Sequence, residues 1–490
     1  MVPPFADLTL AHEAPEGWRL LDLNRAFVER SLAPAHLRGV AAALEAAGSM
    51  RGALLVRAGL DLLEHGGALQ RLRGAGAALT GWTRGSAIEL SADDLFPAGG
   101  ATLERSADAV VAAATGSAFT PELEAARPLV QGAERLVLWV ERDQQLPAAL
   151  ALASMRPAGG HVELAGPYAW RHRRTLAGLP HLAGAGFRPD GCVHALVSGL
   201  PGEPGGARAD TPLRWCEDAR AGDGAPPAPW AGRAALAEAH RVAGPGCRTL
   251  VVDMVALRDG AVLGRDGTSV PVEALGRVRE ALGGGRLVAD WWIGAPGVGR
   301  DGVERTLAGL DALPVDWVAA LRLFTWPVER GEAAWGGAAV TLSAPAPDRD
   351  LARDRPFAAP GTLEVGELPG LLRELHAALG RRAELAPGRL AGAYTTEPEA
   401  APAPGPLVAL DPDCAVVELP ARLDGGPGPS WYAANLREGA VIALDARLGP
   451  ALAGLRRPQP PGAALAGLPA AQRERAAALL SSRGVTRSTS

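Results

Sequence analysis

Short apolar runs alternate with helix-like stretches over much of the chain, and this alternation restricts the fold more than any other feature. The clearest runs are 136–140, 249–253, 287–293 and 318–324. Alanine- and leucine-rich stretches of roughly 10 to 15 residues separate such runs, a spacing typical of βα units. The pattern predicts an α/β protein with parallel strands, and it fits a partial or full (β/α) barrel as well as an open sheet.

Weaker signals complete the expected order of elements. Helix 145–155 carries Pro147 in its first turn, where a missing amide costs no hydrogen bond. Helices are further expected at 34–45, 60–72, 231–243, 270–282, 302–313 and 367–379, and strands at 53–56, 161–164, 193–197, 407–410, 415–419 and 441–444.

The 490 residues suggest about three domains. Glycine and proline are concentrated at 199–230, which indicates a boundary or an elaborated loop. A second proline-rich stretch at 397–406 is typical of a stiff linker. We therefore expect domains at 1–205 and 206–396, a linker at 397–406, and a small α+β region at 407–490.

The charged residues exclude several function classes. The net charge of −5 gives no basic surface for nucleic acid. The chain contains no lysine, so all 49 of its basic residues other than histidine are arginine. Codon bias is the simplest explanation, but the absence also excludes lysine Schiff bases and P-loop lysines. Pyridoxal-phosphate enzymes, P-loop NTPases and typical kinases are therefore not expected.

Hydrophobic runs are too short to span a bilayer, and the first residues, MVPPFADLTL, lack the features of a signal peptide. We expect a soluble cytoplasmic protein. Its four cysteines, Cys192, Cys216, Cys247 and Cys414, form no Cys-x-x-Cys pair, so neither structural zinc nor a self-contained iron–sulfur cluster is expected. Neither a Gly-x-Ser-x-Gly nor a His-Glu-x-x-His motif is present.

One glycine motif, containing Gly297, Gly299 and Gly302, follows an expected strand and opens an expected helix. This context suits a dinucleotide fingerprint, in which glycines let a phosphate approach backbone amides. The strand comes late in the chain, however, and the acidic residue expected beyond the motif is displaced. A purely structural βα turn is the favoured alternative.

Acidic residues at strand ends are the best catalytic candidates. Asp253 ends the run 249–253, and Asp290 lies within 287–293. In barrels the carboxyl ends of the strands carry the chemistry, so either residue could bond a ligand hydroxyl. Each could equally cap the turn that follows its strand.

The order of several segments resembles that of the cobalamin-binding-domain radical S-adenosylmethionine proteins. Segments 143–153, 161–168 and 192–203 resemble the helix, strand and turns of the cobalamin domain, and 248–253 resembles an early barrel strand with its aspartate. The resemblance implies an N-terminal Rossmann-like parallel sheet followed by the barrel. It also implies Gly166 and Gly199 as turns beside the corrin, and it places Glu203 at the turn that is Gly-Glu-Gly-Glu in the family.

The sequence departs from this family at the cluster motif. The family has Arg-Gly-Cys-x-x-x-Cys-x-x-Cys, whereas the corresponding residues here are Cys216, Arg220 and Asp223. Arginine has no lone pair for iron, and one thiolate is too few to hold a [4Fe–4S] cluster. Cys216 is then a relic of a lost cluster motif, and no radical chemistry is expected.

The resemblance and this departure together predict a non-catalytic accessory protein. It would act as a heterodimeric partner or scaffold for an active radical S-adenosylmethionine enzyme, or present a precursor peptide, in natural-product biosynthesis or peptide modification. No bound cofactor, nucleic acid or membrane is expected. The alternative is an enzyme of different chemistry that binds cobalamin or a nucleotide and uses Asp253, Asp290 or Glu203 as acid or base.

Overall fold

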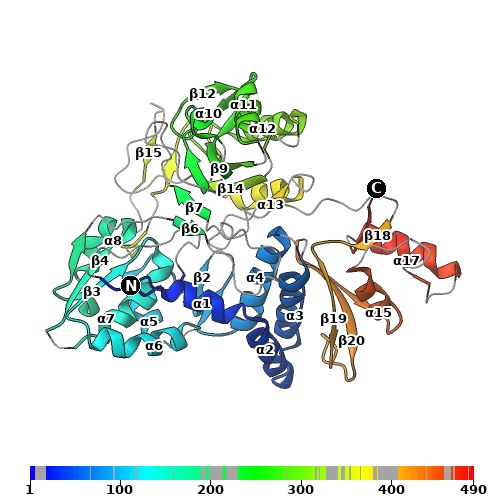
Figure 1. Cartoon of the computed structure of the whole chain (residues 1–490), viewed down its shortest axis with the longest axis horizontal. Helices are drawn as coiled ribbons and strands as arrows, with labels where there is room; N and C mark the ends of the chain where they lie inside the picture. Colours follow the sequence, from blue (N-terminus) through cyan, green and yellow to red (C-terminus); the bar gives the residue numbers. More distant parts are fainter. Residues whose placement is uncertain are drawn as a thin grey trace. The chain divides into compact units, whose positions relative to one another are not determined.

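The computed structural model divides into two compact units (Figure 1). Unit 1 contains Met1–Asn24, Gly99–Ser198 and Ala207–Thr396, and unit 2 contains Arg25–Ala98, Gly199–Gly206 and Glu397–Ser490. The expected consecutive domains differ from these units, because 25–98 and 407–490 share unit 2. The structure describes residues 1–5, 18–66, 68–91, 94–115, 118–157, 159–188, 195–197, 213–216, 230–244, 246–283, 285–314, 317–318, 320–326, 340–343, 348–352, 355–364, 366–378, 383–384, 407–437, 439–456, 465–466, 470–483 and 485–489.

Unit 1 contains a three-stranded parallel sheet in the order β3-β4-β5. Its strands are β3 (Arg135–Trp139), β4 (His161–Ala165) and β5 (Gly186–Arg188). The strands expected at 136–140 and 161–164 and the helix expected at 145–155 are confirmed. The helices of this part are α5 (Ser106–Ala114), α6 (Thr120–Gln131), α7 (Leu146–Ser154), α8 (Pro167–Arg171) and α9 (Arg173–Leu176), with short 3-10 turns η2 (Asp143–Gln145) and η3 (Pro180–Leu182).

A seven-stranded sheet forms the second part of unit 1, in the order β17-β14-β13-β9-β8-β7-β6. All neighbouring pairs are parallel except β6 and β7. Its strands are β6 (Ala195–Val197), β7 (Leu213–Cys216), β8 (Trp230–Ala234), β9 (Cys247–Met254), β13 (Arg286–Ile293), β14 (Ala320–Thr325) and β17 (Ala383–Glu384). Because β6 and β17 stand at opposite ends of this order, the described strands make an open sheet and not a closed barrel.

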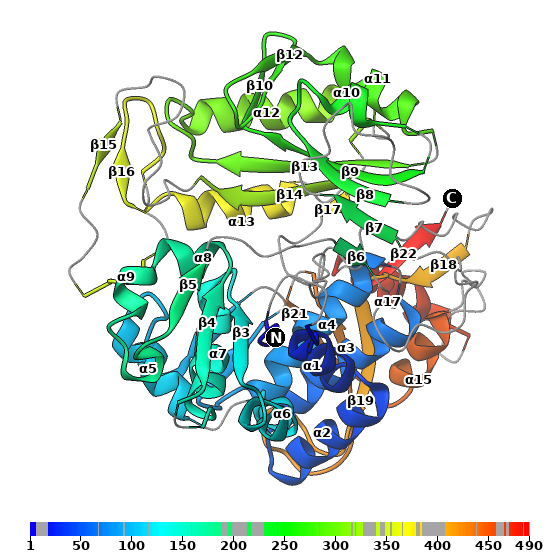
Figure 2. The same ribbon diagram turned by 60° about the vertical axis from the view of Figure 1, so that its left-hand side comes forward.

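Helices and a small antiparallel sheet accompany these strands. Alternate residues of β13 pack with α11 and α12 in one core, as strand periodicity requires, and Figure 2 shows α12 along the sheet. The helix expected at 231–243 is wrong in its first part, because 231–234 belong to β8, and only α10 (Ala239–Val242) is helical there. The other elements are α10 (Ala239–Val242), α11 (Glu273–Ala281), α12 (Arg300–Ala312), α13 (Leu368–Ala378), β10 (Ala256–Arg258), β11 (Ala261–Leu263), β12 (Ser269–Pro271), β15 (Thr341–Leu342) and β16 (Phe357–Ala358).

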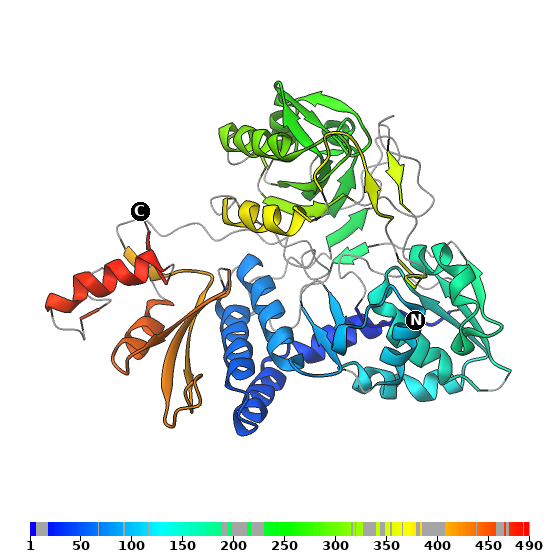
Figure 3. The same cartoon turned by 180° about the vertical axis from the view of Figure 1, so that it is seen from behind.

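Unit 2 combines N-terminal helices with C-terminal strands. Figures 1 and 3 show the orange strands β19 and β20 beside the blue helix α3, and α3 and β19 share a core. The N-terminal elements are α1 (Leu23–Ser31), α2 (Pro34–Ala46), α3 (Met50–His65), α4 (Ala68–Thr83), β1 (Ile88–Leu90), β2 (Leu95–Pro97) and η1 (Ala98–Gly100). The C-terminal elements are β18 (Leu407–Leu410), β19 (Cys414–Leu419), β20 (Ser430–Asn435), β21 (Ala440–Leu444), α15 (Leu448–Ala453), η6 (Gly454–Arg456), α17 (Ala470–Ser482) and β22 (Thr486–Thr489).

The strand expected at 53–56 is wrong, because these residues lie inside α3. Four glycines bring α3 against α4 at this point. A Cβ on Gly59 would lie 2.4 Å from the Gly74 carbonyl oxygen, and a Cβ on Gly81 would lie 2.7 Å from that of Gly52. The seven-residue spacing within each pair, 52 to 59 and 74 to 81, keeps the glycines on one helix face. No described helix is long and apolar enough to cross a membrane.

Glu163 connects the three strands of the small parallel sheet. Its carboxylate accepts hydrogen bonds from Arg135 on β3 and from Arg188 on β5 (3.2 Å), and lies 3.2 Å from His161 Nε2. Burial raises the pKa of Glu163, but the contacts with Arg135, His161 and Arg188 outweigh burial and hold the pKa below its ordinary value.

This lowered pKa predicts an acid-dependent contribution to stability. The folded-state pKa lies below the unfolded-state value, so Glu163 stabilises the fold above about pH 4.3, and this stabilisation is lost as the pH falls through the folded-state pKa. Urea unfolding should therefore find Glu163→Gln less stable than wild type at pH 7, with the difference shrinking toward pH 3. An equal difference at both pH values would contradict the assignment.

Candidate functional site

The candidate site lies where β9, β13 and β14 end. These parallel strands run in register, with Asp253 of β9 opposite Asp290 of β13, and Trp292 of β13 opposite Phe324 of β14. Because parallel strands share a direction, their carboxyl ends meet at one edge, which is the edge that carries the chemistry in (β/α) barrels. We name as the carboxyl-edge cluster the residues Asp253, Arg265, Asp290, Trp292, Phe324 and Trp326.

Two carboxylates lie side by side in this cluster. Asp290 is 0% exposed and Asp253 is half-buried. Neighbouring strands are about 4.8 Å apart, so register partners project from one face as adjacent side chains. Removing a carboxylate from water is costly unless hydrogen bonds or opposite charge compensate it. The structure thus brings together the two acids that the sequence predicts as candidates, and Arg322 of β14 is the register partner of Asp290 on the other side.

Asp253 is hydrogen-bonded to the indole of Trp292. The Trp292 indole Nε1–H donates a hydrogen bond of 2.6 Å to Asp253 Oδ1. The Trp292 ring stacks on Phe324, with 4.8 Å between centroids and 22° between planes, and meets Trp326 almost at right angles (80°, 6.4 Å). The two indoles therefore form a corner beside the Asp253 carboxylate.

Arg265 reaches this corner from a different element. It follows β11, in the turn that leads to β12, and its guanidinium carbon lies 4.1 Å from the Trp292 ring centroid and 5.7 Å from that of Trp326. Aromatic faces carry negative charge density and attract cations at these distances. The cluster thus offers flat apolar walls, a carboxylate acceptor and a guanidinium donor, which together suit a small polar organic ligand.

The glycine motif after β13 contacts the chain's own backbone. Gly297 has φ of +76°, and its amide donates a 2.9 Å hydrogen bond to Thr362 Oγ1. A Cβ on Gly299, the residue that precedes α12, would lie 3.0 Å from the Gly361 carbonyl oxygen. Gly302 lies in the first turn of α12. The Gly297 amide, one of those that a phosphate would approach, is therefore already bonded to Thr362.

Gly166 occupies a position that only glycine adopts easily. Its φ is +104°, and a Cβ there would lie 2.6 Å from the Val140 carbonyl oxygen. The same carbonyl accepts a hydrogen bond of 3.2 Å from the Ala169 amide of α8. Close packing of the β3 end against the start of α8 is thus one reason for glycine at this position.

The structure describes only some of the other candidate residues. Gly199 and Glu203 lie outside the described residues, as do Cys192, Arg220 and Asp223. Cys216 ends β7, and Cys247 begins β9 as a buried free thiol. Across the part of the chain that the structure describes, no group of three or more His, Cys, Asp or Glu side chains could hold a metal ion.

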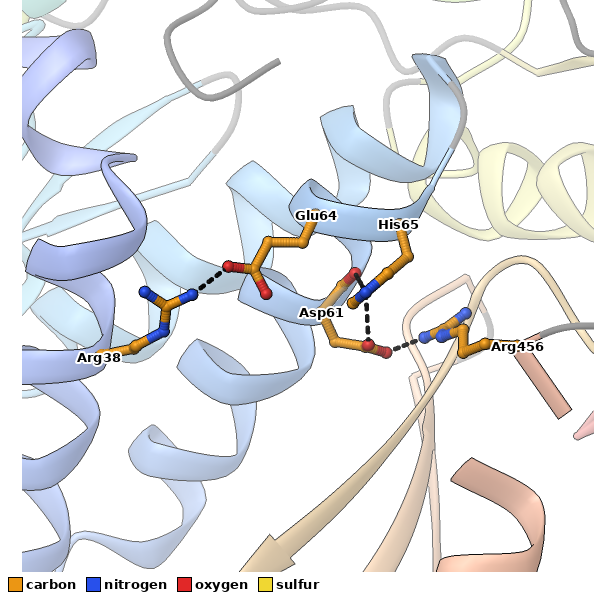
Figure 4. A network of polar contacts seen from close by, with 5 residues as sticks. All are labelled: Arg38, Asp61, Glu64, His65 and Arg456. Carbon is orange, nitrogen blue, oxygen red and sulfur yellow. Dashed lines mark hydrogen bonds and ion pairs between the residues drawn. The ribbon is translucent and has the colours of Figure 1, made fainter. Parts of the chain in front are cut away.

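A second polar network lies in unit 2, on α3 (Figure 4). The Asp61 carboxylate binds Arg456 of η6 and lies 3.1 Å from His65 Nδ1, while Glu64 binds Arg38 of α2. Burial lowers the pKa of the Arg456 guanidinium to about 10. These contacts join α2, α3 and η6, so we interpret the network as structural.

Sequence reasoning missed the aromatic residues and Arg265. The apolar run 287–293 predicts only a strand at Trp291 and Trp292, although side chains alternate along a strand and Trp292 shares a face with Asp290. The β10–β11 hairpin, which precedes the turn carrying Arg265, did have a signal, the Asp259-Gly260 pair between alternating apolar residues. Both residues have positive φ, 51° and 71°, as a type I′ turn requires.

Comparison of the chain with protein-family models, with curated proteins and with solved structures finds no match in any of the three.

Proposed function

We propose that this chain is a non-catalytic accessory protein that binds a small organic ligand at the carboxyl-edge cluster. The observation that carries the proposal is the convergence of Asp253, Asp290, Trp292 and Arg265 at the carboxyl ends of neighbouring parallel strands. In (β/α) barrels the ligand site lies at this edge. Aromatic walls with a few polar groups are the usual lining of such sites.

The strand order supports a relation to the family that the sequence resembles. From β7 to β17 the parallel strands follow one another in chain order without reversal, as they would in a partial (β/α) barrel. We propose that this sheet corresponds to the barrel of that family, and that β3, β4 and β5 correspond to a reduced Rossmann-like, cobalamin-type domain.

The missing thiolates support a role without radical chemistry. Cys216 is the sole cysteine in the stretch that corresponds to the three-cysteine motif, and a [4Fe–4S] cluster needs more thiolates than one. On this proposal the protein holds a ligand, or part of a precursor peptide, for an active radical S-adenosylmethionine enzyme, in natural-product biosynthesis or peptide modification. This partner role rests on analogy with the family.

Thermal unfolding with a panel of compounds tests the proposal. The panel contains hydroxocobalamin, S-adenosylmethionine, NAD(P), methylguanidine, benzoate and any precursor peptide encoded nearby. A ligand that binds only the folded state stabilises it by about 2.7 kcal/mol at about 100 times its Kd. We expect at least one organic ligand to raise the Tm of the wild type by several degrees.

Two matched variants test whether the ligand that raises the Tm binds at Asp253. Asp253→Asn keeps an acceptor for the Trp292 indole but removes charge, whereas Asp311→Asn makes the same change on the exposed surface of α12. The ligand-induced shift should shrink in the first variant and persist in the second. A shift that survives Asp253→Asn unchanged, or a stoichiometric iron–sulfur cluster after reconstitution with iron and sulfide, would contradict the proposal.

The adjacent acids favour an enzyme of different chemistry as the second candidate. Asp253 and Asp290 occupy register positions from which one could serve as general base and the other as general acid. Mass analysis of a bound ligand after incubation separates the two functions. Conversion of the ligand by the wild type but not by Asp290→Asn indicates catalysis, and recovery of the unchanged ligand indicates binding alone.

A further inference from the structure

The corner between Trp292 and Trp326 already holds a cation. The Arg265 guanidinium carbon lies 4.1 Å from one indole centroid and 5.7 Å from the other, and the two rings stand at 80°. Two aromatic faces at right angles around one positive charge are the arrangement by which proteins recognise organic cations. The geometry therefore identifies the charge type that this corner accommodates.

The Asp253 carboxylate also favours a positively charged ligand. Asp253 borders the corner through its hydrogen bond with Trp292, and Asp290, which is fully buried, is its register partner. In the register of the sheet, Asp290 stands between Asp253 of β9 and Arg322 of β14. The half-buried Asp253 carboxylate beside the corner is the group that attracts a cation and repels an anion. An anionic ligand in the corner would also lie against the negative faces of both indoles.

Arg265 belongs to a surface turn and not to a strand of the seven-stranded sheet. The turn 264–268 is closed by hydrogen bonds from the Gly264 amide to the Thr268 carbonyl oxygen and from Thr268 to Asp266 Oδ1. Asp266 and Gly267 at its tip are exposed, and Arg265 itself is half-buried. Displacement of Arg265 from the corner would therefore move a side chain of this turn and not a strand of the sheet.

We propose that the corner formed by Trp292, Trp326 and Asp253 is a binding site for a guanidinium-type cation, and that Arg265 is the internal occupant which such a ligand displaces. This inference rests on the proposed function and names the ligand class of the same site. The ligand is a flat cation with N–H donors, either a free guanidino compound or the arginine side chain of a peptide. The guanidinium plane can lie on one indole while an N–H group donates to Asp253.

If Arg265 competes with the ligand for the corner, removing the Arg265 charge should strengthen ligand binding. Titration calorimetry with methylguanidine should find binding at least tenfold tighter in Arg265→Gln than in the wild type. The matched control is Arg258→Gln, which makes the same change at an exposed position on the neighbouring β10 and should bind like the wild type. Arg265→Lys, which keeps a cation in the turn, should also stay near the wild type. Adding Asp253→Asn to Arg265→Gln should remove the gain.

The choice of ligands distinguishes a free guanidino compound from the arginine side chain of a peptide. Binding of methylguanidine but not of the peptide acetyl-Gly-Arg-Gly-amide supports a free small molecule, and binding of both supports a peptide arginine. Equal methylguanidine affinity in wild type, Arg265→Gln and Arg258→Gln would overturn the inference. Benzoate binding that Arg265→Gln abolishes would make Arg265 an anion anchor, overturning the inference while leaving the proposed function intact. Absence of Trp292-dependent binding for the whole panel would overturn both.

Discussion

Gly59→Ala should destabilise unit 2 by about 3 kcal/mol, at the upper end of the cost of overpacking. The added Cβ would lie 2.4 Å from the Gly74 carbonyl oxygen and 2.8 Å from the Ala78 amide nitrogen. Both atoms belong to backbone, so α3 and α4 must separate. Hydrogen exchange of the full chain measures this locally, and amides of α3 and α4 should exchange roughly 100-fold faster, since 1.4 kcal/mol corresponds to a factor of ten.

Gly39→Ala is the matched control, because it makes the same substitution in a helix of the same unit. Gly39 lies on an exposed face of α2, and no heavy atom lies within 4 Å of an added Cβ. This change should stabilise the helix by about 0.5 to 1 kcal/mol, as alanine generally does relative to glycine. Equal protection in the two variants would contradict the close approach of α3 and α4.

Asp413→Ala should cost about 3 kcal/mol, the low end of the range for breaking a buried ion pair. Asp413 precedes β19 and binds Arg73 of α4, with Gln70 Nε2 3.3 Å from the same carboxylate oxygen. The side chains of Asp413 and Arg73 are only 7% and 18% exposed, so the variant leaves a guanidinium largely removed from water. Hydrogen exchange should accelerate both in α4 and in β18–β19, although about 330 residues separate them in sequence.

Two further variants test the reason for this cost. Asp424→Ala breaks an ion pair with Arg422 whose side chains are both exposed, and it should leave exchange in α4 and β18–β19 unchanged. Arg73→Met combined with Asp413→Leu removes both buried charges and should recover most of the lost stability. Acceleration confined to one of the two segments would contradict the packing of 25–98 with 407–490 in one unit.

Local patterns in the sequence predicted the elements on which the site depends. Strands β9, β13 and β14 fall within a few residues of the expected runs, because each is an apolar segment bounded by turn residues. The sequence predicts Asp253 and Asp290 as candidates because Asp253 ends one apolar run and Asp290 interrupts another. Their juxtaposition could not be predicted, because it depends on the register of two strands that are separated by a hairpin and a helix.

Other features depend on contacts that no local pattern encodes. Residues 53–56 are apolar and suggest a buried strand, yet they are helical because α3 is apolar on several faces, packing against α4 on one and β19 on another. A short apolar run does not distinguish a buried strand from a buried helix. The partnership of 25–98 with 407–490 likewise follows from tertiary contacts such as Arg73 with Asp413, which composition and periodicity do not reveal.

The most direct test of the account follows the indole N–H of Trp292. In nitrogen-15 NMR spectra of the full chain, Trp292→Phe identifies this signal among those of the 12 tryptophans. Saturating ligand should shift the Trp292 signal and those of its cluster neighbours, while the signal of Trp170, exposed on α8, stays in place. A ligand that binds with the Trp292 signal unmoved would contradict a binding site at the carboxyl edge.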